Sequence, residues 1–160
     1  MNKKILAVAI ALVAGRAHAH SQNPVVCLAK NIYYEASGES FDGKVAVAQV
    51  TVNRADGDAR KVCAVVYFKA RSQIDGKIEA SFSWTLGKEW REKGPIDRKV
   101  MRECLLIARA VLAGVLHSRF DSAVKYYHTI GVHPHWHYVF VCRIGRELFY
   151  RRRRVLVASR

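Results

Sequence analysis

The chain has 160 residues, of which 51% are hydrophobic, 25% are charged and 10% are aromatic, with ten glycines and three prolines. This composition excludes a disordered or collagen-like chain and suffices for one hydrophobic core. The formal net charge is +14, which favours anionic partners. No apolar run reaches the roughly 18 residues of a transmembrane helix, which argues against a membrane-spanning protein.

Residues 1–19 have the three parts of a secretory signal peptide. They are a positive start (Asn2-Lys3-Lys4), an apolar run over 5–15 and the small-residue site Ala17-His18-Ala19. We expect cleavage after Ala19 and a mature chain without a transmembrane segment, located in the periplasm or outside the cell. The alternative is a buried N-terminal helix.

Three segments before residue 70 carry periodic apolar residues. Asn23-Pro24 followed by apolar residues at helical spacing predicts a helix that ends near Gly38. Residues 45–52 alternate like a strand, yet they also share a helical face, so periodicity leaves this segment open. Asp56-Gly57-Asp58 indicates a loop, and 62–68 a short apolar element.

The second half of the chain changes from helical to β-like composition. Residues 69–96 are polar and rich in glycine, with an aromatic island at 81–84. Asp97 begins the clearest helix, whose apolar stripe ends before Gly114. Segments 123–128, 138–144 and 148–150 resemble strands, with Gly145-Arg146 as a hairpin turn. The predicted class is α+β, mainly helical with a small β-element near the C-terminus.

The four cysteines, Cys27, Cys63, Cys104 and Cys142, all lie in the exported part. Export favours two disulfides, although four cysteines allow three pairings. We favour Cys27–Cys63 and Cys104–Cys142. The spacing matches no zinc site, so no structural metal is expected.

Glu35 is the first candidate for catalysis. At helical spacing it borders the buried stripe, and it lies in the last helical turn. Partial burial and the helix dipole both disfavour ionisation, so we expect a raised pKa, as a general acid for glycosidic cleavage requires. Glu39, four residues later, is either a second carboxylate near the first or a structural residue paired with a base such as Arg54.

Four histidines, His128, His133, His135 and His137, lie within ten residues and raise the alternative of a zinc hydrolase. They form no defined ligand motif, and no acid occurs between Asp121 and Glu147 to complete a mixed site. We therefore expect no bound metal and interpret the histidines as loop residues.

Aromatic and basic residues supply two further signals. Rings with a polar edge suit sugars, and these candidates are Tyr33, Tyr34, Phe82, Trp84, Tyr126, Tyr127 and Trp136. A net positive charge of this size usually indicates a nucleic-acid partner. In an exported protein it fits anionic envelope polymers instead, so we expect no nucleic-acid partner.

Two consecutive stretches, 27–39 (CLAKNIYYEASGE) and 43–54 (GKVAVAQVTVNR), resemble the opening of SleB-type cell wall hydrolases. Further matching pieces occur in the same order at 62–67, 81–84, 126–128, 134–136 and 144–150. The sequence departs from the family in three places. Ser81 follows Ala80 where many relatives have Gln after Cys, residues 69–80 resemble an insertion or a divergent loop, and His133, His135 and His137 form an unusual cluster.

This resemblance implies a lysozyme-like, mainly helical fold that cuts the glycan strands of peptidoglycan. It implies that Glu35 is the catalytic acid, that residues 43–55 form a helix, and that the reaction is a lytic transglycosylation needing no cofactor. We expect a catalytic domain over residues 20–150 and a basic tail over 151–160.

We expect Tyr126, His128 and Trp136 to line the glycan groove. Two alternatives remain open, a hydrolytic muramidase that uses Glu39 as its second carboxylate and a non-catalytic envelope-binding module. Nucleic-acid binding through the basic tail is a third, and it requires that residues 1–19 are not a signal peptide.

Overall fold

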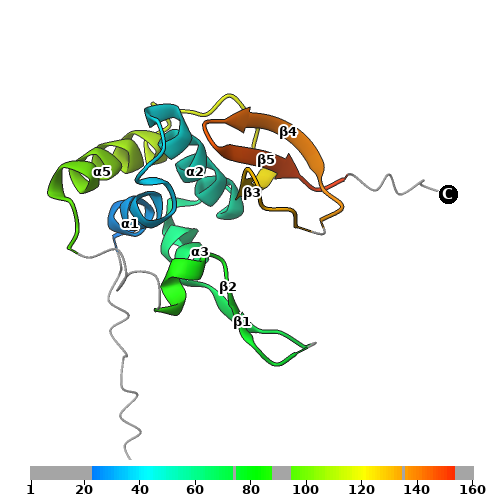
Figure 1. Cartoon of the computed structure of the whole chain (residues 1–160). Helices are drawn as coiled ribbons and strands as arrows, with labels where there is room; N and C mark the ends of the chain where they lie inside the picture. The colour runs from blue at the N-terminus through cyan, green and yellow to red at the C-terminus, as the bar shows by residue number, and fades with distance from the viewer. Residues whose placement is uncertain (1–22, 74, 88–94, 135, 154–160) are drawn as a thin grey trace, which may run out of the picture.

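The computed structural model describes residues 23–153 apart from 74, 88–94 and 135 (Figure 1). Its helices are α1 (Pro24–Ala36), α2 (Phe41–Arg54), α3 (Val62–Tyr67) and α5 (Arg98–Leu112), with short 3-10 helices η1 (Ala59–Lys61) and η2 (Ser83–Leu86). Strands β1 (Lys69–Arg71) and β2 (Ile78–Ala80) form an antiparallel hairpin; β3 (Val124–Thr129), β4 (Val139–Ile144) and β5 (Glu147–Arg151) form an antiparallel sheet in the order β3-β5-β4. The predicted α+β class is confirmed. The predicted signal peptide and residues 154–160 of the predicted tail lie outside the described residues.

Side-chain caps fix the starts of the three long helices. The Asn23 side chain accepts a hydrogen bond from the Val25 amide at 2.9 Å, and Pro24 follows at the first helical position. The Ser40 hydroxyl accepts from the Gly43 amide, and Asp97 caps α5. These caps satisfy amides that have no partner inside the helix, so the boundaries follow from local chemistry.

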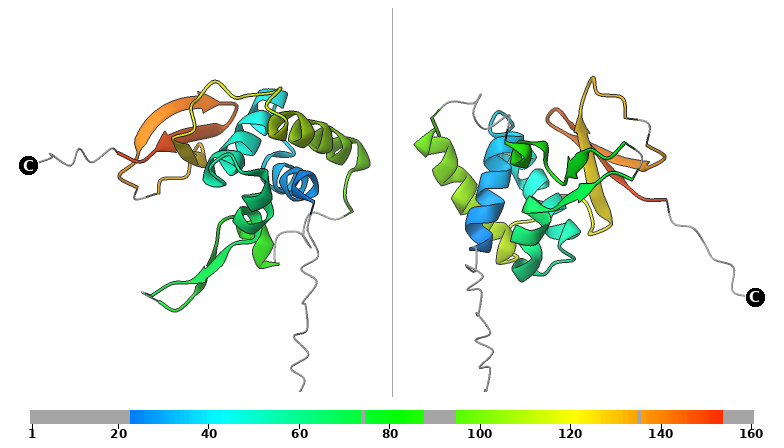
Figure 2. Two further views of the ribbon diagram at one scale, coloured as in Figure 1. Left: turned by 180° about the vertical axis from the view of Figure 1, so that it is seen from behind. Right: turned by 90° about the horizontal axis from the view of Figure 1, so that it is seen from below.

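The ambiguous segment 45–52 is part of helix α2. It alternates like a strand because α2 is buried on nearly every side, and Val45, Ala46, Val47 and Ala48 are all at most 3% exposed. A helix buried all round has no polar face to mark its period. Figures 1 and 2 show α2 between the other helices and the three-stranded sheet.

Two hydrophobic clusters meet on α2. The larger joins α1, α2, α3 and α5, and the smaller packs Ala46 and Val50 of α2 against Val124, Ile144 and Phe149 of the sheet. In this way α2 connects the helical part of the molecule to the inner face of the sheet.

One of the two predicted disulfides is confirmed and the other is wrong. Cys27 and Cys63 are bonded and join α1 to α3. Cys104 and Cys142 are free thiols, because Cys104 is fully buried among the helices whereas Cys142 lies in strand β4 and packs against the second cluster. Burial raises the pKa of the Cys104 thiol to about 11, which keeps this thiol protonated and unreactive.

Residues 69–80, which we interpreted as an insertion or a divergent loop relative to the family, form the β1–β2 hairpin. Its strand residues are nearly all exposed, so neither face carries the alternating apolar pattern that predicts a strand. The hairpin projects from the helices, away from α5 (Figures 1 and 2).

Among the described residues, no helix has both the length and the apolar character to cross a bilayer.

Candidate active site

Glu35 lies in the last turn of α1 with a partly buried side chain. The hydroxyl of Tyr127, from the middle of β3, donates a hydrogen bond of 2.7 Å to Glu35 Oε2. This contact brings together residues that are 92 positions apart in the chain. It fixes the orientation of the carboxyl group that the sequence singles out.

Tyr127 is a rigid hydrogen-bond donor. Its ring packs on Phe149, which is fully buried, with 5.7 Å between ring centroids. Burial, reinforced by the neighbouring Glu35 carboxylate, raises the pKa of the Tyr127 hydroxyl well above its usual value. The hydroxyl therefore keeps its proton and donates it to the hydrogen bond with Glu35 at any physiological pH.

Arg54 is held beside this pair by backbone oxygens. As the last residue of α2, it donates from Nε to the Lys125 carbonyl at 2.7 Å and from Nη1 to the Ser81 carbonyl at 3.1 Å. Burial lowers the pKa of the Arg54 guanidinium, while attraction to the Glu35 carboxylate opposes that shift. An arginine remains cationic under these conditions, so the site holds a fixed positive charge close to Glu35.

A network of buried polar side chains supports the helix that carries Glu35. The Asn31 side chain accepts from the Trp84 indole at 2.9 Å and donates to the Thr51 hydroxyl at 3.0 Å. Asn31 and Thr51 are fully buried, and Trp84 is 6% exposed. The Trp84 ring stacks on Tyr34 with 4.5 Å between centroids. Together these contacts fix α1 against α2 and η2.

Glu39 contacts the turn between β4 and β5. Its Oε2 accepts a hydrogen bond of 3.1 Å from the Arg146 amide. Gly145 has a φ of 59°, and a Cβ at this position would collide with Glu39 Oε2. Glu39 thus joins the start of α2 to the sheet. Its function as a second catalytic carboxylate stays a prediction.

Glu147 is a buried carboxylate that sequence reasoning did not single out. It is 5% exposed, and its Oε1 accepts a hydrogen bond of 2.9 Å from the Thr129 hydroxyl. Its Oε2 has no partner among the described residues. Burial raises the pKa of Glu147, and the nearby Glu39 acts in the same direction. The neutral form is therefore favoured relative to an exposed glutamate.

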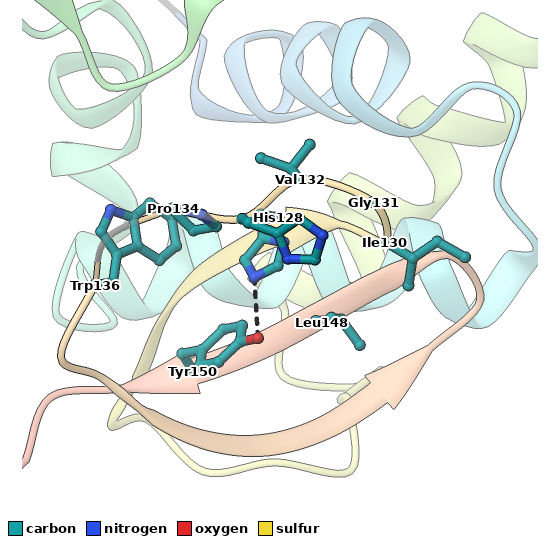
Figure 3. A pocket seen from close by; sticks show the side chains of 9 residues that line it. His128, Ile130, Gly131, Val132, Pro134, Trp136, Leu148 and Tyr150 are labelled. Atoms are coloured by element: carbon teal, nitrogen blue, oxygen red, sulfur yellow. Dashed lines mark hydrogen bonds between the residues drawn. The ribbon is translucent and has the colours of Figure 1, made fainter.

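The three residues predicted to line the groove lie together on the outer face of the sheet. The Trp136 ring lies 6.2 Å from the Tyr126 ring and 5.7 Å from the His128 ring. His128 also contacts the Tyr150 hydroxyl through Nε2 at 2.9 Å (Figure 3). Because side chains alternate along β3, Tyr126 and His128 lie on the face opposite to Tyr127. They are thus separated from Glu35 by the sheet.

Two cavities flank these groups. One, of about 400 Å³, adjoins Arg54 and is lined also by Phe68 and Ser81. The other, of about 290 Å³, lies on the outer face beside His128 and Trp136 (Figure 3). Glu35 lines neither of these two cavities.

The histidine cluster is only partly described. His133 lines the outer-face cavity, and His135 lies outside the described residues. Among the residues that are described, no group of three or more His, Cys, Asp or Glu is arranged to hold a metal ion.

Sequence reasoning singled out Glu35 but not the two residues that the structure places beside it, Tyr127 and Arg54. Tyr127 appeared only as one of several aromatic residues, and Arg54 as a partner for Glu39. Strand alternation does predict that Tyr126 and Tyr127 face opposite ways. Which of the two faces the carboxylate depends on how β3 packs against α2, which lies between the sheet and the other helices.

One comparison with known proteins gives a match. A family model described as Cell Wall Hydrolase matches residues 38–150, a range that begins three residues after Glu35. No curated protein and no solved structure matches the chain.

Proposed function

Because the chain belongs to the cell wall hydrolase family, whose substrate is peptidoglycan, we propose that it cleaves the β-1,4 bond between N-acetylmuramic acid and N-acetylglucosamine with Glu35 as the proton donor. The observation that carries this proposal is the hydrogen bond from Tyr127 to the Glu35 carboxyl group, beside Arg54. The mainly helical architecture with a small sheet is consistent with the lysozyme-like fold that the sequence resemblance implies.

In the proposed reaction, Glu35 protonates the bridging oxygen while the glycosidic bond breaks through an oxocarbenium-like state. Tyr127 keeps the carboxyl group in one orientation, which reduces the entropic cost of reaching the reactive geometry. The fixed positive charge of Arg54 stabilises the carboxylate that remains once the proton has left. The hydrogen bond from Tyr127 and the charge of Arg54 both favour the ionised form of Glu35, which is the form that accepts a proton in the second step.

A lytic transglycosylase fits this arrangement with one carboxylate. After bond cleavage, the ionised Glu35 takes the proton of the muramyl 6-hydroxyl, whose oxygen attacks C1 to form the 1,6-anhydro product. A hydrolase instead needs a second carboxylate at about 5 to 9.5 Å. Glu39 is the candidate for that function, yet its Oε2 accepts the Arg146 amide. We therefore favour transglycosylation.

The cavity beside Arg54 is the proposed place for a sugar next to the scissile bond. Its volume of about 400 Å³ accommodates one sugar ring, and the Phe68 ring, 58% exposed, offers an apolar surface for stacking. Arg54 is shared between this cavity and the Glu35 site.

The proposed location is the periplasm or the cell exterior. The family acts on the cell wall, and the Cys27–Cys63 disulfide fits an oxidising compartment. The predicted cleavage after Ala19 provides the route of export. N-terminal sequencing of the exported protein tests this, since we expect His20 as the first residue.

Mass spectrometry of peptidoglycan digested by the purified protein tests the proposed reaction. We expect muropeptides that end in 1,6-anhydromuramic acid, at the same rate with and without EDTA. Ordinary reducing ends would support the hydrolytic alternative, and loss of activity that zinc restores would support a metal site at the histidines. Glycan strands left intact would contradict the proposal.

A non-catalytic envelope-binding module is the second candidate. The outer face of the sheet favours it, because exposed aromatic rings there suit carbohydrate binding without requiring Glu35. Binding of the protein to isolated cell walls without release of any muropeptide would support this alternative.

A further inference from the structure

The outer face of the three-stranded sheet carries a pocket that the proposed reaction does not use. It has a volume of about 290 Å³ and lies between the loop after β3 and the side chains of Leu148 and Tyr150 on β5 (Figure 3). Ile130 and Val132 of the loop contribute apolar side chains, and Trp136 closes one end (Figure 3).

This pocket and Glu35 lie on opposite faces of the same sheet. His128 pairs with Leu148 across β3 and β5, and Tyr127 pairs with Phe149. Paired residues share a face and successive residues alternate. The pocket side chains therefore point away from the face where Tyr127 contacts Glu35.

The walls of the pocket combine flat rings with a fixed polar group. Trp136 is 42% exposed, and its ring is inclined by 85° to the Tyr150 ring and by 73° to the His128 ring. The His128 ring is fixed at both nitrogens, because Nδ1 donates to the Thr129 carbonyl and Nε2 contacts the Tyr150 hydroxyl. Hydroxyl and imidazole groups beside an exposed indole suit a sugar, whose C–H face stacks on the ring.

The apolar part of the pocket favours an N-acetylated sugar. Val132 and Leu148 offer aliphatic surface of the kind that an acetamide methyl group buries. A plain hexose carries no such methyl group.

The surrounding charge favours an anionic polymer. Residues 124–153 contain six Lys or Arg and one acidic residue, Glu147. Glu147 is buried and pairs with Thr129, so it lies on the inner face. Arg143 pairs with Leu148 and lies on the pocket face. Peptidoglycan, whose lactyl and peptide groups carry carboxylates, combines this charge with N-acetylated sugars.

We propose that this pocket is a second saccharide site, which binds an N-acetylhexosamine of the same peptidoglycan that the enzyme cleaves, away from the catalytic carboxyl group. The inference rests on the proposed function for its substrate class. A second contact keeps the enzyme on an insoluble polymer between cleavage events, because it raises the local concentration of bonds at the first site.

An NMR titration of the Glu35→Gln protein with chitotetraose tests where the sugar binds. The variant removes the proposed proton donor, so the probe is not consumed. We expect shifts of the Gly131 and Leu148 amides and of the Trp136 indole, in addition to shifts around Tyr127. Shifts confined to the surroundings of Tyr127 and residue 35 would overturn the second site.

Sedimentation with purified cell walls then tests the contribution of the pocket. In the Glu35→Gln background, Trp136→Ala is expected to weaken wall binding about tenfold, as the loss of one stacking contact does. Trp136→Phe keeps an aromatic ring and is expected to restore most of the binding. The matched control is Leu106→Ala on α5, which removes an apolar side chain that is 59% exposed on another element and is expected to leave binding unchanged.

Equal wall binding by the Trp136→Ala and control proteins would overturn the proposal. The proposal would also be overturned if a single-stranded oligonucleotide bound the same pocket residues more tightly than chitotetraose does. That result would identify the pocket as part of a nucleic-acid surface. The proposed function fails separately, if the unmodified enzyme releases no muropeptides from cell walls that it binds.

Discussion

The two faces of the β3-β5-β4 sheet use the same kinds of residue in opposite ways. On the inner face, Tyr127 and Phe149 are packed against α2, and the Tyr127 hydroxyl holds one carboxyl group. On the outer face, Tyr126 and Tyr150 belong to an accessible aromatic cluster around Trp136. Of two adjacent residues in β3, Tyr127 thus positions a carboxyl group on the inner face, whereas Tyr126 contributes to an accessible surface on the outer face.

The largest expected difference between the two faces is in stability. Phe149→Ala removes a fully buried ring from the inner face and is expected to cost about 3 to 5 kcal/mol of unfolding free energy. Phe140→Ala removes a ring that is 54% exposed on the outer face and should cost less than about 1 kcal/mol. Urea unfolding followed by circular dichroism measures both. Similar losses of unfolding free energy in both variants would show that the two faces of the sheet do not differ in this way.

The next difference is in activity. Tyr127→Phe keeps the buried ring but removes the hydrogen bond to Glu35, so we expect the lysis rate to fall about 10- to 100-fold with little loss of stability. The matched control is Tyr33→Phe, which removes a hydroxyl that accepts from the Asp97 amide and does not contact the Glu35 carboxyl group in the described structure. We expect it to lyse walls at close to the wild-type rate. An equal loss in both variants would show that the Tyr127 hydroxyl acts through stability alone.

A smaller effect concerns the buried carboxylate of the inner face. The pKa of Glu147 is raised in the folded protein, mainly by burial. When the pH rises above the usual glutamate range, Glu147 loses its proton in the unfolded chain before it does so in the folded protein. The free energy of unfolding therefore decreases with pH until the pH passes the raised pKa of the folded state. Glu147→Gln cannot ionise and keeps the acceptor for Thr129. Its stability relative to the wild type should therefore be higher at pH 7 than at pH 4, by about 1 kcal/mol or less.

Thermal unfolding of both proteins between pH 4 and pH 7 measures this effect. The groups that act on Glu147 besides Thr129 are Glu39, His128 and Arg146, and all three are unchanged in the variant. Glu79→Gln, on the exposed strand β2, is the control for loss of one surface charge. A difference from the wild type that does not change with pH would contradict the assignment.

Local signals in the sequence predict much of this fold. Asn23, Asp97 and Gly145 mark two helix starts and the β4–β5 turn, and the structure has all three. Each acts within a few residues, through a capping hydrogen bond or a positive φ. Such signals depend little on the rest of the molecule, so the structures that they specify can be predicted from a single sequence.

Features that depend on packing between distant parts of the chain cannot be predicted from local signals. The β1–β2 hairpin has no buried face, so its strands show no apolar alternation. Glu147 lies in a strand where a glutamate is expected to face solvent, but it faces inward to Thr129. The free Cys104 depends on its place in the helical core. Of the candidate site, the sequence identified Glu35 through its position at a helix end, whereas its partner Tyr127 comes from 92 residues away.

The rate at which the Glu35→Gln protein solubilises purified peptidoglycan tests whether Glu35 is the proton donor. The substitution keeps the shape of the side chain and an acceptor for the Tyr127 hydroxyl, so circular dichroism and melting temperature should match the wild type. Because the amide cannot donate a proton to the glycosidic oxygen, we expect the rate to fall by at least about 100-fold. Solubilisation by Glu35→Gln at the wild-type rate would contradict the account.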